Sequence, residues 1–290
     1  MVMVENPAKF DSPLSSILNN YSTELTSRDS KSLSAAGELL SPGSEIFIAA
    51  LPGDSADKLV AAASQLRRAG LVPVPHIVAR NIASRQELDE LLGRLVGEAG
   101  IDRALTLGGD RDKPEGEYNC SLQLIESGLL QKHGVGRIAI GCYPEGHPRI
   151  SDAALDQARA DKLAAAAKAG LDVTLVSQFC FDAKPIVALV RKIRAEGVTA
   201  PFRVGVAGPA NRTTLIKYAM MCGVGPSLRI MKERQDMAMS LMAGETPEGL
   251  LAEVGLEQAR DPKLGIAGVH FFTFGSLAKS AEWAEMHRRS

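Results

Sequence analysis

Several polar residues of this 290-residue chain stand directly after short apolar runs, a position where parallel α/β proteins collect functional groups. Glu24 ends the first run, in TELTSRD, and Gly109 and Asp110 follow the fourth, in LTLGGD. Burial can raise the pKa of such a carboxylate until it donates protons near neutral pH, so Glu24 is a candidate general acid. The alternative is a solvated glutamate beside Arg28.

The Gly108-Gly109 pair precedes Asp110 and can let the backbone approach a planar ligand closely. Asp110 could then accept hydrogen bonds from a heterocycle rich in N–H donors. An ordinary turn between a strand and a helix, capped by an aspartate, explains these residues equally well.

Two further strand ends carry polar groups. Tyr143, Glu145 and His147 lie in YPEGHP, where two prolines stiffen a loop that could hold a cofactor; a structural turn with a hydrogen-bonded histidine is the alternative. Gln178, in SQFCFD, pairs a donor with an acceptor on one planar amide, which suits an amide-like edge of a ligand. It could also simply cap a strand.

Histidines and cysteines do not indicate a metal site. His76 and His270 lie within apolar strands, and we interpret them as core or supporting residues rather than metal ligands. The cysteines are widely spaced, form no C-x-x-C pair, and predict neither zinc nor disulfides but a reducing compartment. They are Cys120, Cys142, Cys180 and Cys222.

The elements that position these groups alternate between short β-rich runs and amphipathic helical stretches, which predicts parallel strands with helical crossovers. Eight such units, without a glycine fingerprint after the first strand, favour a closed (β/α)8 TIM-type barrel over an open doubly wound sheet. The predicted strands are Asn20–Thr26, Glu45–Leu51, Leu71–His76, Arg103–Leu107, Arg137–Cys142, Asp172–Gln178, Phe202–Ala207 and Gly265–Phe272.

Helix boundaries are predicted from capping residues. Ser84, followed by Glu87 three residues later, is typical of a capping box at a helix start. Other predicted starts are Asp182, Asn211 and Thr246-Pro247, with the proline at the first helical position; predicted ends are Gly70, Gly170 and Gly197.

We expect two regions, an N-terminal arm (residues 1–19) and a single barrel catalytic domain (residues 20–290). The arm is polar with little apolar periodicity, so it should be loosely held. Between strands 7 and 8, Gly223–Lys263 should carry two helices beyond the one a barrel unit requires. These could shape the mouth of the barrel or an oligomer contact.

Charge and hydropathy favour a small-molecule partner. The 33 Lys and Arg residues nearly cancel the 34 Asp and Glu residues, so we expect no nucleic-acid partner and no attraction to an anionic membrane. No apolar run is long enough for a membrane span and no leader segment is recognisable, so we expect a soluble cytoplasmic protein that could form a homo-oligomer.

The chain resembles the methylenetetrahydrofolate reductase family from about Tyr21 to Trp283, because TELTSRD, LGGD, YPEGHP, SQFCFD and GVHFFTF follow one another in the family's order. The resemblance implies an oxidoreductase that interconverts 5,10-methylenetetrahydrofolate and 5-methyltetrahydrofolate with NAD(P)H or NAD(P)+, in a direction the sequence leaves open. It implies that Glu24 is the general acid and that Asp110 is also catalytic.

The remaining roles also follow from the resemblance. Asp110 would anchor the pterin and Gln178 would bind the folate substrate, whereas Gly109, Asp110, Tyr143 and His147 would contact an FAD cofactor. Three positions depart from the family pattern in ways that weaken the expected hold on FAD. Gly108 stands where many members have arginine, Leu51 where many have threonine, and Ala166 where many have lysine.

Two other functions are compatible with these residues. A barrel lyase acting on a phosphorylated substrate would need a strand-end lysine, and none is evident, although the helix start near Phe274-Gly275-Ser276 could bind phosphate. A reductase-like subunit that binds folate without turnover is the second alternative.

Overall fold

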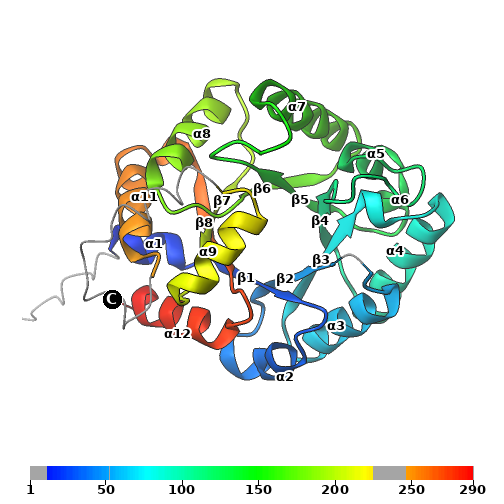
Figure 1. Ribbon diagram of the computed structural model, residues 1–290, viewed down its shortest axis with the longest axis horizontal. Coiled ribbons are helices and arrows are strands. Elements are labelled where there is room, and N and C mark those ends of the chain that lie inside the picture. The colour runs from blue at the N-terminus through cyan, green and yellow to red at the C-terminus, as the bar shows by residue number, and fades with distance from the viewer. Residues whose placement is uncertain (1–11, 52, 225–245, 290) are drawn as a thin grey trace, which may run out of the picture.

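The computed structural model describes residues 12–51, 53–224 and 246–289. Eight parallel strands form a closed barrel in sequence order, with helices around it (Figure 1). The predicted (β/α)8 TIM-type barrel is therefore confirmed. The strands are β1 (Tyr21–Thr26), β2 (Glu45–Ala49), β3 (Val72–Val78), β4 (Arg103–Leu107), β5 (Arg137–Cys142), β6 (Asp172–Ser177), β7 (Phe202–Ala207) and β8 (Ile266–Phe272).

Strands β4, β5 and β7 have the predicted limits, and the ends of the other strands differ from the predicted ones by one or two residues. The clearest difference is β3, which continues past His76 because Ile77 and Val78 pair with Thr106 and Leu107 of β4. Pairing with β4 thus determines where β3 ends, and this pairing cannot be predicted from the amino-acid composition of β3 alone.

The helices are α1 (Pro13–Leu18), α2 (Ser30–Leu39), α3 (Ala56–Arg68), α4 (Arg85–Ala99), α5 (Ser121–Glu126), α6 (Leu129–Lys132), α7 (Asp152–Lys168), α8 (Ala183–Ala195), α9 (Arg212–Met221), α11 (Glu248–Arg260) and α12 (Leu277–Arg288). Ser84 caps α4 as predicted, accepting a bond from the Glu87 amide at 3.2 Å. The Glu87 carboxylate accepts from the Ala83 amide at 2.6 Å rather than from the cap residue itself.

Most of the other predicted boundaries also agree. Asp182 and Asn211 cap α8 and α9 through their side chains. The three glycines predicted as helix ends all have positive φ, which a side chain would disfavour. Pro247 is the cap residue of α11 rather than its first helical residue.

Alternation along the strands divides the apolar residues into two sets. One set forms a small cluster inside the barrel, made of Phe47, Val74, Leu105, Ala139 and Val176. The other set packs between the strands and the surrounding helices and forms the main core. Polar side chains lie on either side of this inner cluster, with Glu24 toward the carboxyl ends of the strands and Glu45, Arg103 and Arg203 at their amino ends.

The N-terminal segment is not loosely held where the structure describes it. Pro13–Leu18 form α1, in which Ile17 and Leu18 are buried. Ser15 also donates to the carbonyl of Arg288 at 2.8 Å, across 273 residues of chain. The expectation of a loose arm overlooked this helix because six residues are too few to display a helical period; residues 1–11 lie outside the described part.

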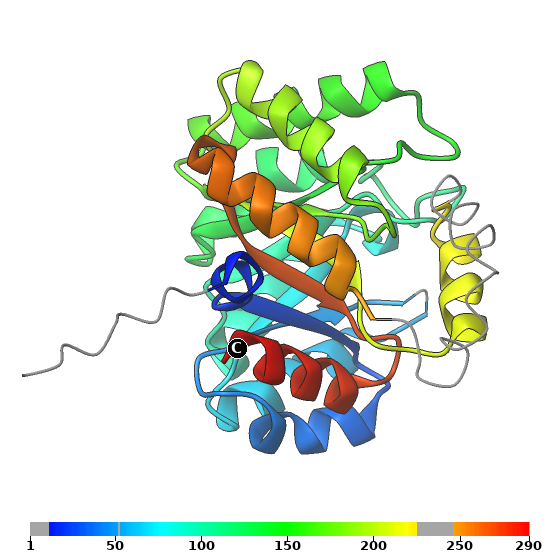
Figure 2. The ribbon, with the colours of Figure 1, turned by 90° about the vertical axis from the view of Figure 1, so that its left-hand side faces the viewer.

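The described part of the segment between β7 and β8 carries one helix more than a barrel unit requires, where two more were predicted. Helix α9 stands at the end of the barrel toward which the strands point, at the right in Figure 2. Helix α11 occupies the outer ring and packs against α8 and α1. Helix α11 lies within the predicted stretch Gly223–Lys263, as expected, and residues 225–245 of that stretch lie outside the described chain. Within the described ranges, no helix is long and apolar enough to cross a membrane.

Candidate functional site

Glu24 lies at the carboxyl end of β1 with a histidine on either side. Its Oε2 is 3.3 Å from Nε2 of His76 on β3 and 3.6 Å from Nε2 of His270 on β8. The Glu24 side chain is 19% exposed, whereas His76 and His270 are only 8% and 1% exposed. One carboxylate therefore reaches solvent from between two buried imidazoles.

The histidines determine the charge state of this carboxyl group. Burial raises the pKa of Glu24, but hydrogen bonding and charge attraction from His270 and His76 outweigh burial and lower that pKa to about 2. The expectation of a raised pKa is wrong, because it considered burial without the flanking imidazoles. Glu24 is therefore ionised at neutral pH.

His270 is held by a second partner. Its Nδ1 is 2.9 Å from Oγ of Ser22. Ser22 lies on β1, two residues before Glu24, and β1 is adjacent to the strand of His270, β8. If the serine hydroxyl donates to Nδ1, the proton of a neutral imidazole lies on Nε2 and faces Glu24. Burial lowers the pKa of His270, although Glu24 opposes that shift. Ser22, His270 and Glu24 thus form one chain of polar contacts.

Sequence reasoning interpreted both histidines as core or supporting residues, and the structure shows them buried beside Glu24. A β-strand sends alternate side chains to the same face, so His270 shares a face with Phe272, and His76 with Val78. Barrel closure then pairs Glu24 with Phe272 across β1 and β8. Strand alternation could have indicated an inward direction, but only the closed sheet shows that the three residues meet.

The loop after β4 carries Gly109 and Asp110. Gly109 has a φ of +98°, and a Cβ there would lie 2.5 Å from Cγ1 of Val78, so this position requires glycine. Asp110 is exposed, and its backbone carbonyl accepts from Arg149 at 3.4 Å. Arg149 also pairs with Asp112 at 2.9 Å, which ties this loop to the one after β5.

Tyr143 and His147 lie together in the loop after β5. Their rings pack edge to face with centroids 5.3 Å apart. His147 Nδ1 accepts from the Arg149 amide at 3.2 Å, so a neutral ring carries its proton on Nε2. Burial lowers the pKa of His147 and raises that of Tyr143, and Asp110 acts electrostatically on both. Asp110, Tyr143 and His147 are therefore neighbours.

Gln178 and Glu145 occupy different surroundings. Gln178 follows β6, and its side-chain oxygen accepts from the Phe179 amide at 3.0 Å, which fixes the orientation of the carboxamide. Glu145 lines a cavity of about 510 Å³ bordered by α7 and α8, which Tyr143 also lines but Gln178 does not. Polar residues after the strands therefore do not all line one pocket.

Helix α9 brings its carboxyl end to the same mouth. Both Glu24 and Asp110 help raise the pKa of Cys222, to about 11, after the larger effect of burial. A Cβ on Gly223 would lie 2.5 Å from Cγ of Pro148 in the loop after β5. In the loop after β8, Phe274 has a φ of +49° and stacks on Tyr218 of α9 with centroids 4.1 Å apart. Aromatic rings therefore border the mouth beside α9.

Three positions bear on flavin binding. Gly108 offers no side chain, although a Cβ there would meet open space. Leu51 is 38% exposed and its amide donates to Asp54 at 2.9 Å. Ala166 is fully buried in the main core. None of the three presents a polar side chain to a cofactor, so these residues do not fit a tightly held flavin.

The described residues offer little support for Schiff-base or metal chemistry. None of the eight strands contains a lysine that could form a Schiff base. No group of three or more His, Cys, Asp or Glu side chains within the described ranges could hold a metal ion. All four cysteines are free.

Fold and site together define a (β/α)8-barrel protein with its polar groups at the carboxyl ends of the strands. The family model described as methylenetetrahydrofolate reductase matches residues 46–280. The chain therefore belongs to the methylenetetrahydrofolate reductase family. The matched range begins after β1, so the assignment of Glu24 rests on its position in the structure.

Two solved structures share the barrel at low sequence identity. An uncharacterised protein from Clostridium thermocellum, which binds two copies of 5-methyl-5,6,7,8-tetrahydrofolic acid, has a TM-score of 0.58 and 12% identity, with 93% of this chain and 98% of that one covered. Dihydropteroate synthase from Thermus thermophilus, in complex with 6HMPPP, has a TM-score of 0.50 and 17% identity, with coverage of 93% and 92%. At these identities the similarity establishes the fold alone.

Proposed function

We propose that this protein is a methylenetetrahydrofolate reductase-type enzyme, which interconverts 5,10-methylenetetrahydrofolate and 5-methyltetrahydrofolate with NAD(P)H or NAD(P)+. The observation that carries the proposal is Glu24 between His76 and His270 at the carboxyl-end mouth. Family membership supplies the substrate class. The C. thermocellum protein, which binds a reduced folate on the same fold, is consistent with it.

Protonation is the task that this cluster suits. Opening the five-membered ring of the methylene adduct requires a proton on a folate nitrogen, and the resulting iminium then accepts a hydride to become the methyl group. A folate covering Glu24 would exclude water from the exposed part of its carboxylate. Such desolvation raises the pKa of a carboxyl group, so Glu24 would take up a proton from solvent as the ligand binds. Glu24 would then deliver that proton.

The other mouth residues would position the ligand. Asp110 would accept hydrogen bonds from the N–H groups of the pterin, and Gln178 would present its carboxamide to the substrate. Gly109 would permit close approach of the backbone, with Tyr143 and His147 contacting a cofactor. The nicotinamide cofactor would supply the hydride.

Replacement of Glu24 by Gln tests the proposal directly. We expect turnover to fall by roughly 10²-fold or more, with folate affinity nearly unchanged, because the amide keeps the shape but cannot carry the proton. Anaerobic assays of NAD(P)H oxidation with methylenetetrahydrofolate, and of the reverse reaction, measure turnover. Fluorescence titration measures folate binding.

Glu38→Gln, on the exposed side of α2, is the matched control and should retain full activity. Unchanged turnover in Glu24→Gln would remove Glu24 from the mechanism. Folate binding without turnover in the wild-type protein, in either direction and with either nicotinamide, would instead support a binding subunit. An absorbance spectrum of the same preparation tells whether flavin accompanies the protein.

A further inference from the structure

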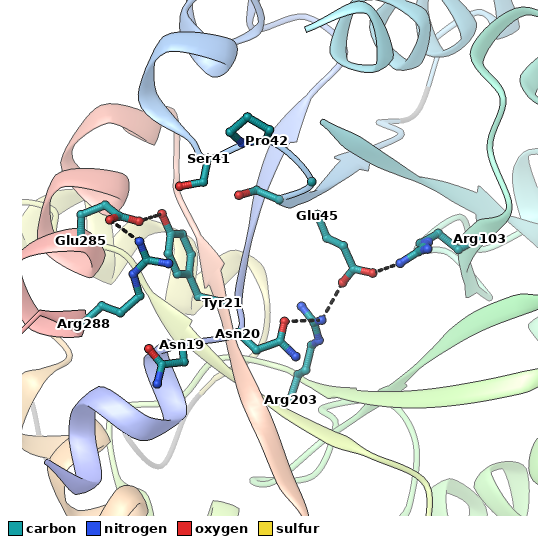
Figure 3. Close-up of a pocket in the computed structure, with 12 residues that line it drawn as sticks. Asn19, Asn20, Tyr21, Ser41, Pro42, Glu45, Arg103, Arg203, Glu285 and Arg288 are labelled. Atoms are coloured by element: carbon teal, nitrogen blue, oxygen red, sulfur yellow. Dashed lines mark hydrogen bonds and ion pairs between the residues drawn. The ribbon is translucent and has the colours of Figure 1, made fainter. Parts of the chain in front are cut away.

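A second polar cavity opens at the other end of the barrel, where the strands begin (Figure 3). It measures about 360 Å³ and is lined by residues at the starts of β1, β2, β4 and β7 and by the end of α12. Because parallel strands place their first residues at one mouth and their last at the other, this cavity lies away from Glu24. The proposed folate chemistry does not use it.

Arg203 is the most informative residue of this cavity. Its side chain is only 9% exposed, and its Nη2 donates to Glu45 at 2.6 Å and to Asn20 at 3.2 Å. Its Nη1 is buried and has no hydrogen-bond partner among the described residues. A buried donor without a partner typically costs about 1–3 kcal/mol, more for a charged group, so a ligand that accepts from Nη1 would relieve that cost.

The local sheet geometry fixes this guanidinium. The register between β7 and β8 shifts between Phe202 and Arg203, and such irregularities redirect a side chain. With Nη2 held from two sides by Glu45 and Asn20, the direction of Nη1 is set as well. Figure 3 shows the guanidinium between these two residues.

The charges around the cavity favour an anion. Three guanidinium groups in the lining, on Arg103, Arg203 and Arg288, face only two carboxylates. Glu45 already accepts from Arg103 and Arg203. Asp102, outside the lining, pairs with Arg103 but also with Arg137, so it does not cancel the excess.

The second carboxylate of the lining is occupied too. Glu285 accepts from the Tyr21 hydroxyl at 3.1 Å and from Arg288 at 2.7 Å (Figure 3). Arg288 is less buried than Arg203, with its side chain 29% exposed. The cavity therefore has an unpaired donor in its interior, Nη1 of Arg203, and a second guanidinium group nearer the solvent, that of Arg288.

We propose that this cavity binds a small oxyanion, either a phosphate or a carboxylate group. Arg203 donates from the interior through Nη1, and Arg288 attracts the anion from the rim. Guanidinium groups bind both kinds of oxyanion through charge-assisted hydrogen bonds. The site is distinct from the carboxyl-end mouth, so its occupancy acts on the stability of the barrel.

Thermal unfolding of the full chain, followed by the fluorescence of Trp283, tests this site. Inorganic phosphate and acetate are titrated separately against sodium chloride at matched ionic strength. A ligand that binds only the folded state raises Tm with a saturable concentration dependence. We expect such a rise with at least one of the two anions, and the comparison identifies which group the cavity prefers. Isothermal titration calorimetry with that anion measures the affinity.

Variants locate the effect. Arg203→Met should abolish the saturable rise, and Arg288→Gln, which leaves the interior intact, should weaken affinity about tenfold or more while remaining folded. Arg68→Gln, at the exposed end of α3, is the matched control for loss of one positive charge and should behave like the wild-type protein. A rise that does not saturate, no rise at all, or an equal rise in Arg288→Gln and Arg68→Gln would overturn the proposal.

Discussion

At the scale of single residues, Glu24 shows how neighbours outweigh burial. A mostly buried carboxylate ordinarily has a raised pKa, yet two imidazoles within 3.3 and 3.6 Å keep this one ionised. The charge state of Glu24 therefore has its origin in His76 and His270.

The lowered pKa of Glu24 predicts a pH dependence of stability. A carboxyl group with a folded-state pKa of about 2 and an ordinary value of 4.5 stabilises the fold above pH 4.5. That contribution is lost as the pH falls from 4.5 toward 2, because the unfolded chain binds the proton first. Urea unfolding at a series of pH values should show a loss on the order of 1–3 kcal/mol that Glu24→Gln lacks. Parallel curves for the two proteins would mean that Glu24 is not held ionised by the histidines.

At the scale of elements, two adjacent glycines in the loop after β4 differ in whether they could be replaced by a larger residue. A Cβ at Gly108 meets open space, whereas one at Gly109 would collide with Val78 on a backbone of positive φ. The loop thus needs Gly109 for its shape, while Gly108 is free to change.

We therefore predict that Gly108→Arg folds normally and binds FAD roughly tenfold or more tightly than the wild-type protein, because a guanidinium can bond to the phosphates. Flavin fluorescence quenching measures the affinity. Gly109→Ala, the contrasting variant, should lower Tm and weaken ligand binding. An unaltered FAD affinity in a folded Gly108→Arg protein would show that the arginine does not reach the cofactor.

Helix α1 is held by a close backbone approach. A Cβ on Gly255 of α11 would lie 2.3 Å from the carbonyl oxygen of Pro13, whereas one on Gly249 of the same helix would meet nothing within 4 Å. Replacing glycine by alanine inside a helix stabilises the helix by up to about 1 kcal/mol. Substitution at Gly249 therefore reports helix propensity alone, whereas substitution at Gly255 also reports packing against α1.

We predict that Gly255→Ala destabilises the protein by about 1–3 kcal/mol, because α1 must move away from α11. Gly249→Ala should be neutral or slightly stabilising. Chemical denaturation compares the two variants. Equal stability would indicate that α1 contributes little to the fold, as the sequence had suggested for residues 1–19.

At the scale of the whole molecule, closure of the barrel brings its first and last strands together. It sets β1 beside β8, so that Glu24 and His270 meet although they belong to the first and last strands. It also leaves two polar mouths separated by the apolar cluster inside the barrel. The proposed reaction belongs to one mouth, and the proposed oxyanion site to the other.

Local patterns in the sequence were enough to predict the number, order and approximate limits of the strands, because alternation of apolar residues and capping side chains are local properties. They also identified the strand-end positions of Glu24, Asp110, Tyr143, His147 and Gln178. The roles of these residues in catalysis or ligand binding stay predictions until the variants are assayed.

Contacts between distant segments became known only from the folded chain. The pairing of Glu24 with His76 and His270, the packing of α1, the position of α9 at the mouth and the unpartnered nitrogen of Arg203 are of this kind. The physical reason is that pKa values and hydrogen-bond satisfaction are set within a few ångströms of space. Residues close in space here lie up to hundreds of positions apart along the chain.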